Sequence, residues 1–192
     1  MDMLRVMDSL SSERPVFHSE DDFKFSLAWN LKCLYPDVKI RLEVPCGSER
    51  VDIIVQYNGM YYPVEVKYKK ARFEYTQGGE LFKFSDDTAY TQNHPKLIND
   101  IRRIEKHSES LNKGLRLGFA IWLTNDHIYW DGPQSSDANY APYTVKEGVV
   151  LSEITGEMDD IMLQGKYSVH WEDYSEFETR NGWFRYALIR IE

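Results

Sequence analysis

Apolar and polar positions alternate in a way that divides the first two thirds of the chain into helices and strands. A helix is expected to begin after Ser19, because serine caps helix N-termini and the three acids that follow suit the positive end of the helix dipole. Pro36 ends it. One apolar stripe along this helix consists of Phe23, Leu27, Leu31 and Leu34. The segment therefore predicts an amphipathic helix over about 19–35.

A second apolar stripe lies on another side of the same helix. Phe25, Trp29 and Cys33 recur at intervals of four residues, which places them on one line along a helix. Two stripes indicate either burial on two sides or a surface for a partner. A second copy of the chain is one such partner, so a homodimer is a candidate assembly.

Three strands are expected after this helix. Residues 39–44 alternate between polar and apolar positions, which is typical of a strand. Residues 50–57 and 60–68 are two further strand candidates, joined by Asn58 and Gly59. Asn-Gly is the strongest short signal for a hairpin with a type I′ turn.

The rest of the chain predicts one more helix and several strands. A helix is expected over about 95–107, with Pro95 in its first turn, and a strand over 115–124 is apolar enough to be covered on both faces. Residues 131–139 indicate a loop. Short strands are expected at 128–130, 149–151, 167–171 and 184–191. The fold class is therefore α/β: a core of α-β-β-β-α-β order at about 19–124, with a β-rich extension at 125–192.

Composition narrows the class of protein. The length of 192 residues predicts one domain, and the net charge of −8 disfavours a protein that coats nucleic acid without specificity. Cys33 and Cys46 are too few for a disulfide framework or a four-thiolate zinc site, so reduced thiols in a cytoplasmic protein are expected. No apolar run approaches the roughly 18 residues of a membrane span, so no membrane partner is expected.

The hairpin allows one geometric deduction about chemistry. With Asn58 and Gly59 as the loop, Tyr57 faces Met60, and counting back along both strands places Asp52 opposite Glu65. The two acids fall on a non-hydrogen-bonded pair, where Cβ atoms are about 4.5–5.5 Å apart. Two facing carboxylates repel each other unless a cation compensates them.

A divalent cation would provide that compensation. Mg²⁺ is typically held by one or two carboxylates together with waters and phosphate oxygens. Lys67 lies two residues after Glu65 and therefore on the same face of the strand. The alternative is an exposed hairpin face that carries Asp, Glu and Lys only because such residues are common on surfaces.

These residues resemble the motif of the PD-(D/E)XK nuclease superfamily, the restriction-endonuclease-like phosphodiesterases. Asp52 matches the aspartate of the motif, and Glu65, Val66 and Lys67 match its second part. The resemblance implies a mixed central sheet flanked by helices. It also implies that Asp52, Glu65 and the backbone carbonyl of Val66 bind Mg²⁺ or Mn²⁺, while Lys67 orients or activates water.

The resemblance suggests further site residues. An acid from the first helix often completes the site in this family; Glu20 is the candidate, and its alternative role is to stabilise the helix dipole. Lys69, Lys70 and Arg72 would hold the flanking substrate backbone, or form a solvated basic strand end. Gln92 could reach the site from the second helix, or make a polar surface contact.

The expected function is a metal-dependent nuclease that hydrolyses phosphodiester bonds of nucleic acid, with DNA as the first candidate. Mechanistically, Lys67 would supply positive charge in the transition state, or act as a base if its neighbours lower its pKa. The alternative is an inactive nuclease-like fold that binds nucleic acid or protein. The net charge of −8 motivates that alternative.

Overall fold

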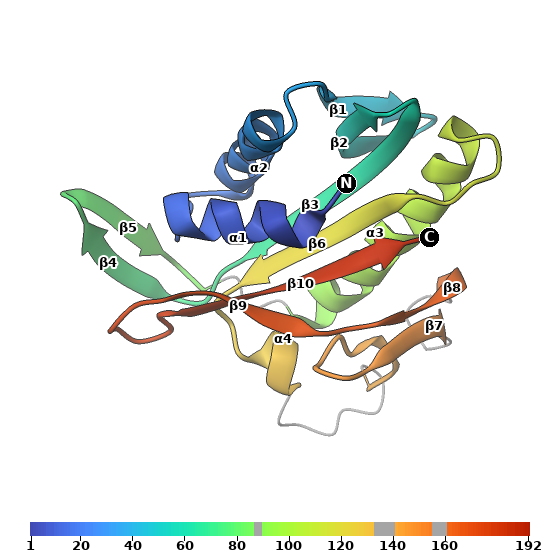
Figure 1. The fold of residues 1–192 in the computed structure, drawn as a ribbon. Coiled ribbons are helices and arrows are strands. Elements are labelled where there is room, and N and C mark those ends of the chain that lie inside the picture. The colour runs from blue at the N-terminus through green and yellow to red at the C-terminus, as the bar shows by residue number, and fades with distance from the viewer. Residues whose placement is uncertain (87–89, 133–140, 155–160) are drawn as a thin grey trace.

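A six-stranded mixed sheet lies between helical layers (Figure 1). The structure, a computed structural model, describes residues 1–86, 90–132, 141–154 and 161–192. In spatial order the strands are β1 (Lys39–Cys46), β2 (Glu49–Tyr57), β3 (Met60–Lys69), β6 (Gly118–Thr124), β10 (Trp183–Ile191) and β9 (Trp171–Glu176). β3 and β6 are parallel, and all other neighbours in this sheet are antiparallel.

The hairpin of β2 and β3 has the expected turn and register. Asn58 and Gly59 have φ angles of 50° and 78°, as a type I′ turn requires. Tyr57 pairs with Met60, and the same register continues as far as the pair of Ile53 and Val64. The predicted register is therefore confirmed from the turn as far as Ile53, the residue next to Asp52.

Two helices cover one face of the sheet. α1 (Met3–Glu13) and α2 (Glu20–Leu34) bury their apolar stripes against Ile53 of β2 and against even-numbered residues of β3 such as Val66. Ser19 caps α2 as expected, since its side chain accepts a hydrogen bond from the N–H of Asp22. α1 was not among the expected elements. Its apolar residues do have the spacing of one helix face, and the buried ones are Met3, Val6, Met7 and Leu10.

The second stripe of α2 does not pack on the sheet. Phe25 and Trp29 are 61% and 63% exposed, and Cys33 is an exposed free thiol. Burial on two sides is therefore wrong within the described structure, and the partner surface stays a prediction. Cys46 is also a free thiol.

The other face of the sheet carries α3 (Tyr90–Leu111) and the short helix α4 (Ile128–Asp131) (Figure 1). α3 begins five residues earlier than expected, so Pro95 lies inside the helix instead of in its first turn. Residues 128–130, expected as an extended piece, form α4. There the N–H groups of Asp131 and Gly132 donate to carbonyls four residues earlier.

β6 is fully buried, as its apolar sequence predicted. The hairpin of β4 (Phe73–Gln77) and β5 (Glu80–Phe84) is an insertion that was not expected, and Gly78 and Gly79 form its turn. A further hairpin joins β7 (Val150–Ile154) to β8 (Ile161–Ser168), and a single 3₁₀ turn spans Ala141–Tyr143.

The remaining expectations are corrected in detail. The strand expected at 167–171 is wrong, because these residues span the end of β8 and the beginning of β9. The expected loop at 131–139 lies largely outside the described residues. The α/β class, the mixed sheet flanked by helices and the β-rich C-terminal part are all observed. No helix in the described ranges is long and apolar enough to cross a membrane.

Candidate active site

The candidate site lies where β2 separates from β3. Beyond the pair of Ile53 and Val64 the backbone ladder between these strands ends. Two N–H groups on the exposed edge of β3 then donate to carboxylates: Val66 to Asp52 Oδ2 (3.0 Å) and Tyr68 to Glu20 Oε2 (3.0 Å). Carboxylates thus replace a neighbouring strand, which satisfies the backbone and brings two acids into the gap.

The pairing of β1 with β2 is also irregular at Asp52. β1 pairs with β2 in one continuous register, but the pair of Glu43 and Asp52 is missing from it. Glu43 has a φ angle of 52°, in the left-handed region that residues other than glycine seldom adopt. Lys24 of α2 binds the carboxylate of Glu43, and its Nζ lies 3.6 Å from Asp52 Oδ1.

Lys67 occupies the middle of the acidic cluster. Its Nζ lies 3.7–3.8 Å from Glu20 Oε1, Asp52 Oδ2 and Asp100 Oδ2, and it donates to the carbonyl of Val66 (3.0 Å). Burial acts to lower the pKa of Lys67, but the surrounding carboxylates outweigh it and the pKa is raised. Lys67 is therefore an ammonium at neutral pH. This favours its role as a positive charge over that of a base.

Glu65 is one of the two deeply buried acids of the cluster. Its side chain is 2% exposed; Oε2 accepts a hydrogen bond from Arg103 Nη2 (2.9 Å), while Oε1 has no hydrogen-bond partner among the described residues. Burial, together with the charges of Asp100 and Asp52, raises the pKa of Glu65 to about 9. A buried carboxyl beside another acid needs a proton or a cation between them.

Three residues of the site were not expected from the sequence. Asp100 and Arg103 come from α3, and Lys24 comes from α2. Asp100 is 3% exposed, and burial raises its pKa to about 6. A signal for Asp100 was present, because it lies between Leu97 and Ile101 at the margin of the buried stripe of α3.

The oxygen donors of the site suit a hard divalent cation. Asp52 and Glu65 lie side by side, and Glu65 Oε1 is buried without a donor, which is the condition that a bound cation would relieve. In the described part of the chain, no three His, Cys, Asp or Glu side chains gather closely enough to form a metal-ligand group. The residues present therefore suit an ion that is coordinated by two carboxylates and by other oxygen ligands.

The predicted substrate-binding residues lie in different surroundings. Lys70 donates to the carbonyl of His18 and lies over the rings of Tyr68 and Phe84, so it fastens the β4–β5 hairpin to the body. Lys69 is half-buried on β3. Arg72 and Gln92 are exposed, and Gln92 lies in the first turn of α3. Their role in binding stays a prediction.

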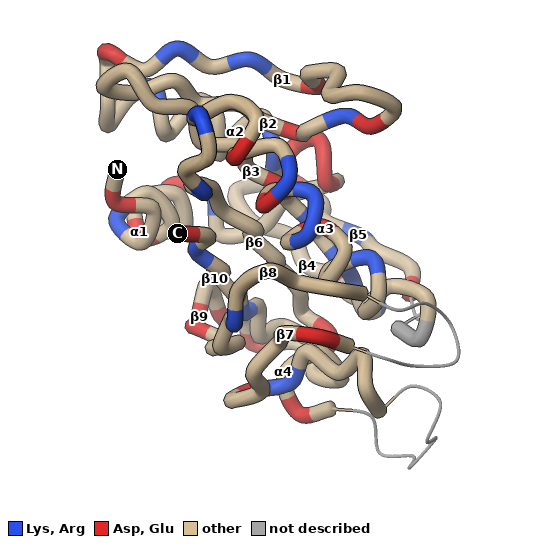
Figure 2. Tube along the Cα trace, turned by 90° about the vertical axis from the view of Figure 1, so that its right-hand side faces the viewer, with Lys and Arg blue, Asp and Glu red and all other residues tan. Residues whose placement is uncertain are grey.

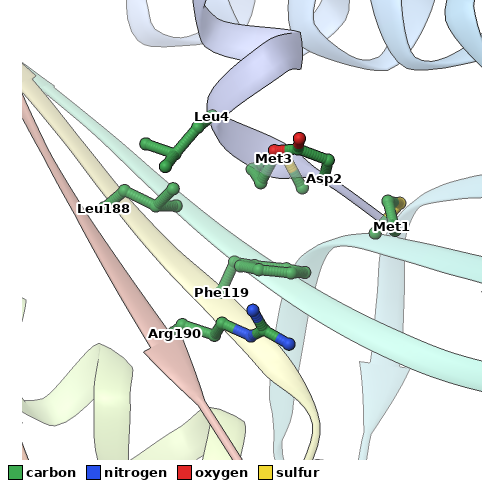
Figure 3. A pocket seen from close by; sticks show the side chains of 7 residues that line it. All are labelled: Met1, Asp2, Met3, Leu4, Phe119, Leu188 and Arg190. Carbon is green, nitrogen blue, oxygen red and sulfur yellow. The ribbon is translucent and has the colours of Figure 1, made fainter.

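A pocket of about 530 Å³ lies elsewhere on the molecule (Figure 3). It is formed by the N-terminal residues together with Phe119, Leu188 and Arg190, and Leu4 faces Leu188 across it. Phe119 and Leu188 belong to the face of the sheet that α1 and α2 cover, whereas Glu65 and Lys67 lie on the opposite face. This pocket is therefore separate from the acidic cluster.

The chain matches no protein-family model, no curated protein and no solved structure. Its chemistry must therefore be inferred from the geometry of the site.

Proposed function

We propose that this protein is a metal-dependent nuclease that hydrolyses phosphodiester bonds, with DNA as the first candidate substrate. The observation that carries the proposal is the pairing of Asp52 and Glu65 where β2 leaves β3, with Lys67 beside them. A half-exposed hairpin face would not hold an acid that is 2% exposed against another acid. Burial and the neighbouring acids raise the pKa of Glu65 even with Arg103 beside it, so the pairing costs stability, which favours a functional role.

The order of the elements supports the resemblance to PD-(D/E)XK nucleases. α2, β1, β2, β3, α3 and β6 follow one another as an α-β-β-β-α-β core, interrupted by the β4–β5 insertion. The four core strands are adjacent in the order β1-β2-β3-β6, and β6 is parallel to β3. This is the mixed sheet that the resemblance implies, and a restriction-endonuclease-like core is part of the proposal.

Asp52 and Glu65 would hold Mg²⁺ or Mn²⁺, with the Val66 carbonyl as a further ligand. A bound ion of this kind supplies Lewis-acid polarisation of a phosphoryl oxygen and lowers the pKa of a coordinated water. Lys67, charged at neutral pH, stabilises negative charge that develops on the phosphoryl group. Glu20 positions Lys67 and completes the edge of β3, since its two oxygens face Lys67 Nζ and the N–H of Tyr68.

The exposed face of α3 supports a polyanionic substrate. Its exposed charged residues are Lys96, Arg102 and Lys106, whereas Asp100 and Glu105 are buried and Glu109 is half-buried beside Arg116. Figure 2 shows Lys and Arg positions recurring along α3. On a chain of net charge −8, this basic face beside the acidic cluster is suited to a phosphate backbone.

One observation favours a second candidate, a nuclease-like fold that only binds nucleic acid or protein. Lys67, Arg103 and Lys24 already neutralise much of the acidic cluster, and the described residues contain no group of three metal-binding side chains. In that case the cationic side chains are permanent structural partners of the acids. Metal-dependent cleavage distinguishes the two candidates.

The test is an assay of purified protein on plasmid DNA, linear duplex, single-stranded DNA and RNA, with Mg²⁺, Mn²⁺ or EDTA. The variants are Asp52→Asn, Glu65→Gln and Lys67→Met, and the exposed Glu172→Gln on β9 is the control. We expect metal-dependent cleavage by the wild type and the control, reduced about a hundredfold or more in the three site variants.

Circular dichroism and thermal melting establish that each variant is folded. Equal cleavage by all variants would assign the activity to a contaminant. Absence of cleavage on every substrate, with folded protein and both metals, would support the binding module instead.

A further inference from the structure

Arg103 is the counter-ion of the two most deeply buried acids of the site. Its Nη2 lies 2.9 Å from Glu65 Oε2 and also binds Asp100 Oδ1. Both acids are nearly inaccessible to water, at 2% and 3% exposed, whereas Arg103 itself is 24% exposed. The guanidinium therefore covers the acids from the solvent side.

The hydrogen bonds of Arg103 leave much of its guanidinium unused. Both ion pairs engage the same nitrogen, Nη2. Nε is buried, and no described residue accepts a hydrogen bond from it. A guanidinium carries five N–H donors in a planar fork that fits two oxygens of a phosphate. Arg103 thus has free donors beside the proposed reaction centre.

A divalent cation at Glu65 and the guanidinium of Arg103 would repel each other. Like charges a few ångströms apart in a partly buried site interact strongly, since the solvent screens them weakly. Asp100 gives Arg103 a second anchor three residues earlier on α3. Arg103 can therefore leave Glu65 and remain attached to the helix face beside the site.

Lys67 is less suited to such an exchange. It is 18% exposed, with Glu20, Asp52 and Asp100 all within 3.8 Å of its Nζ. If the carboxylate of Asp52 binds a metal ion, Lys67 still has ion pairs with Glu20 and Asp100. Arg103 depends on Glu65 and Asp100 alone among the ion pairs of the described residues.

Arg103 also lies in line with the basic face of α3. Lys96, Asn99, Arg103 and Lys106 are spaced by three, four and three residues, which places them along one side of the helix. They span about 15 Å at 1.5 Å per residue. A backbone that follows Lys96 and Lys106 would pass Arg103.

Building on the proposed nuclease function, we propose that Arg103 exchanges partners: its guanidinium is bonded to Glu65 in the metal-free protein and binds a substrate phosphate once a divalent cation takes its place at Glu65. Arg103 then couples metal binding to the binding of nucleic acid. The metal-free protein would bind nucleic acid weakly at this point, because Arg103 is occupied by the two acids.

The test compares Arg103→Gln with Arg180→Gln, which removes an exposed charge from the loop between β9 and β10. The first measurement is calorimetric titration with Mn²⁺. The second is fluorescence anisotropy of a duplex oligonucleotide with cleavage-resistant phosphorothioate linkages, with Mn²⁺ and with EDTA. Arg103→Lys is a further variant that keeps the charge but not the fork, in case Arg103→Gln does not fold.

We expect Arg103→Gln to bind Mn²⁺ about tenfold more tightly than the wild type, and Arg180→Gln to bind it equally. We expect Mn²⁺ to increase oligonucleotide affinity in the wild type and in Arg180→Gln but not in Arg103→Gln, with Arg103→Lys showing a reduced gain.

Unchanged or weaker Mn²⁺ binding by Arg103→Gln, or a full metal-induced gain in it, overturns the exchange while leaving the nuclease proposal intact. If Arg103→Gln is unfolded, a full gain in Arg103→Lys overturns it. Absence of Mn²⁺ binding by the wild type overturns both proposals.

Discussion

Replacement of Glu65 by glutamine is predicted to stabilise the metal-free protein at neutral pH. Burial and two neighbouring acids raise the pKa of Glu65 from 4.5 to about 9, so this carboxyl takes up a proton when the chain folds. The amide of Glu65→Gln keeps an acceptor for Arg103 and a donor for Asp52, but it does not titrate. The variant therefore removes only the cost of protonation.

The size of this effect follows from the two pKa values. Each pH unit between 4.5 and 9 removes about 1.4 kcal/mol from the stability of the wild type relative to the variant. Below pH 4.5 Glu65 is protonated in both the folded and the unfolded state, so the difference vanishes. At pH 7 the variant should be more stable by about 3 kcal/mol.

The assay is urea unfolding in EDTA at several pH values from 5 to 8. Glu105→Gln is the matched control, because Glu105 is equally buried but is fully bonded. It accepts hydrogen bonds from the N–H groups of Gln164 and Gly165 and from the Tyr167 hydroxyl. Its replacement should lower stability by about 2 kcal/mol or more.

The change in the free energy of unfolding should thus have opposite signs for Glu65→Gln and Glu105→Gln. A Glu65→Gln variant that is destabilised as much as Glu105→Gln would refute the reasoning. So would a difference from the wild type that does not grow with pH, since the protonation of Glu65 would then not be linked to folding.

Three further outcomes are expected from other parts of the structure. Asn112→Ala should lower stability by about 2 kcal/mol in urea unfolding, because the Asn112 side chain bonds both the N–H and the carbonyl of Tyr61 (2.8 and 2.7 Å). Burial lowers the pKa of His94 from 6.5 to about 4, so the wild type should lose about 1.4 kcal/mol per pH unit relative to His94→Asn as the pH falls through this range; parallel curves would contradict it. Gly118→Ala should lower the melting temperature, since a Cβ there would lie 2.3 Å from Ile104 Cγ2 and force α3 away from the sheet.

The sequence predicted the hairpin and its register because both depend on local chemistry. Asn58 and Gly59 select a turn with two positive φ angles, and the turn determines which residues of β2 and β3 face each other. The proximity of Asp52 and Glu65 follows from that register. The separation of the strands beyond Ile53 could not be foreseen, because there the side chain of Asp52 and the carboxylate of Glu20 from α2 accept the N–H groups of β3.

The contribution of α3 to the site was not predictable in the same way. Asp100 and Arg103 reach Glu65 because α3 packs across β3 and β6, a tertiary arrangement that no local pattern encodes. Sequence periodicity identified α3 itself from its apolar stripe, but not which of its polar residues face the sheet margin. The complete set of site residues follows only from the register of the hairpin together with the packing of α3.

Two other errors have separate causes. α1 has a regular apolar stripe with Met3, Val6 and Leu10, but the elements expected from the sequence began only at Ser19. Residues 128–130 have aromatic side chains that favour strands, yet they form α4 because Tyr129 and Trp130 are buried against Trp171. Short segments of this kind follow tertiary packing more than their own preference.

The most direct test of the paired carboxylates is the binding of Mn²⁺, followed by the loss of the free-ion signal in electron paramagnetic resonance. The proteins to compare at pH 7.5 are the wild type, Asp52→Asn, Glu65→Gln and the exposed control Glu172→Gln. We predict that the wild type and the control bind the ion, and that either site substitution weakens binding about a hundredfold or more. Equal binding by all four proteins, or no binding by the wild type at millimolar Mn²⁺, would contradict a cation held between Asp52 and Glu65.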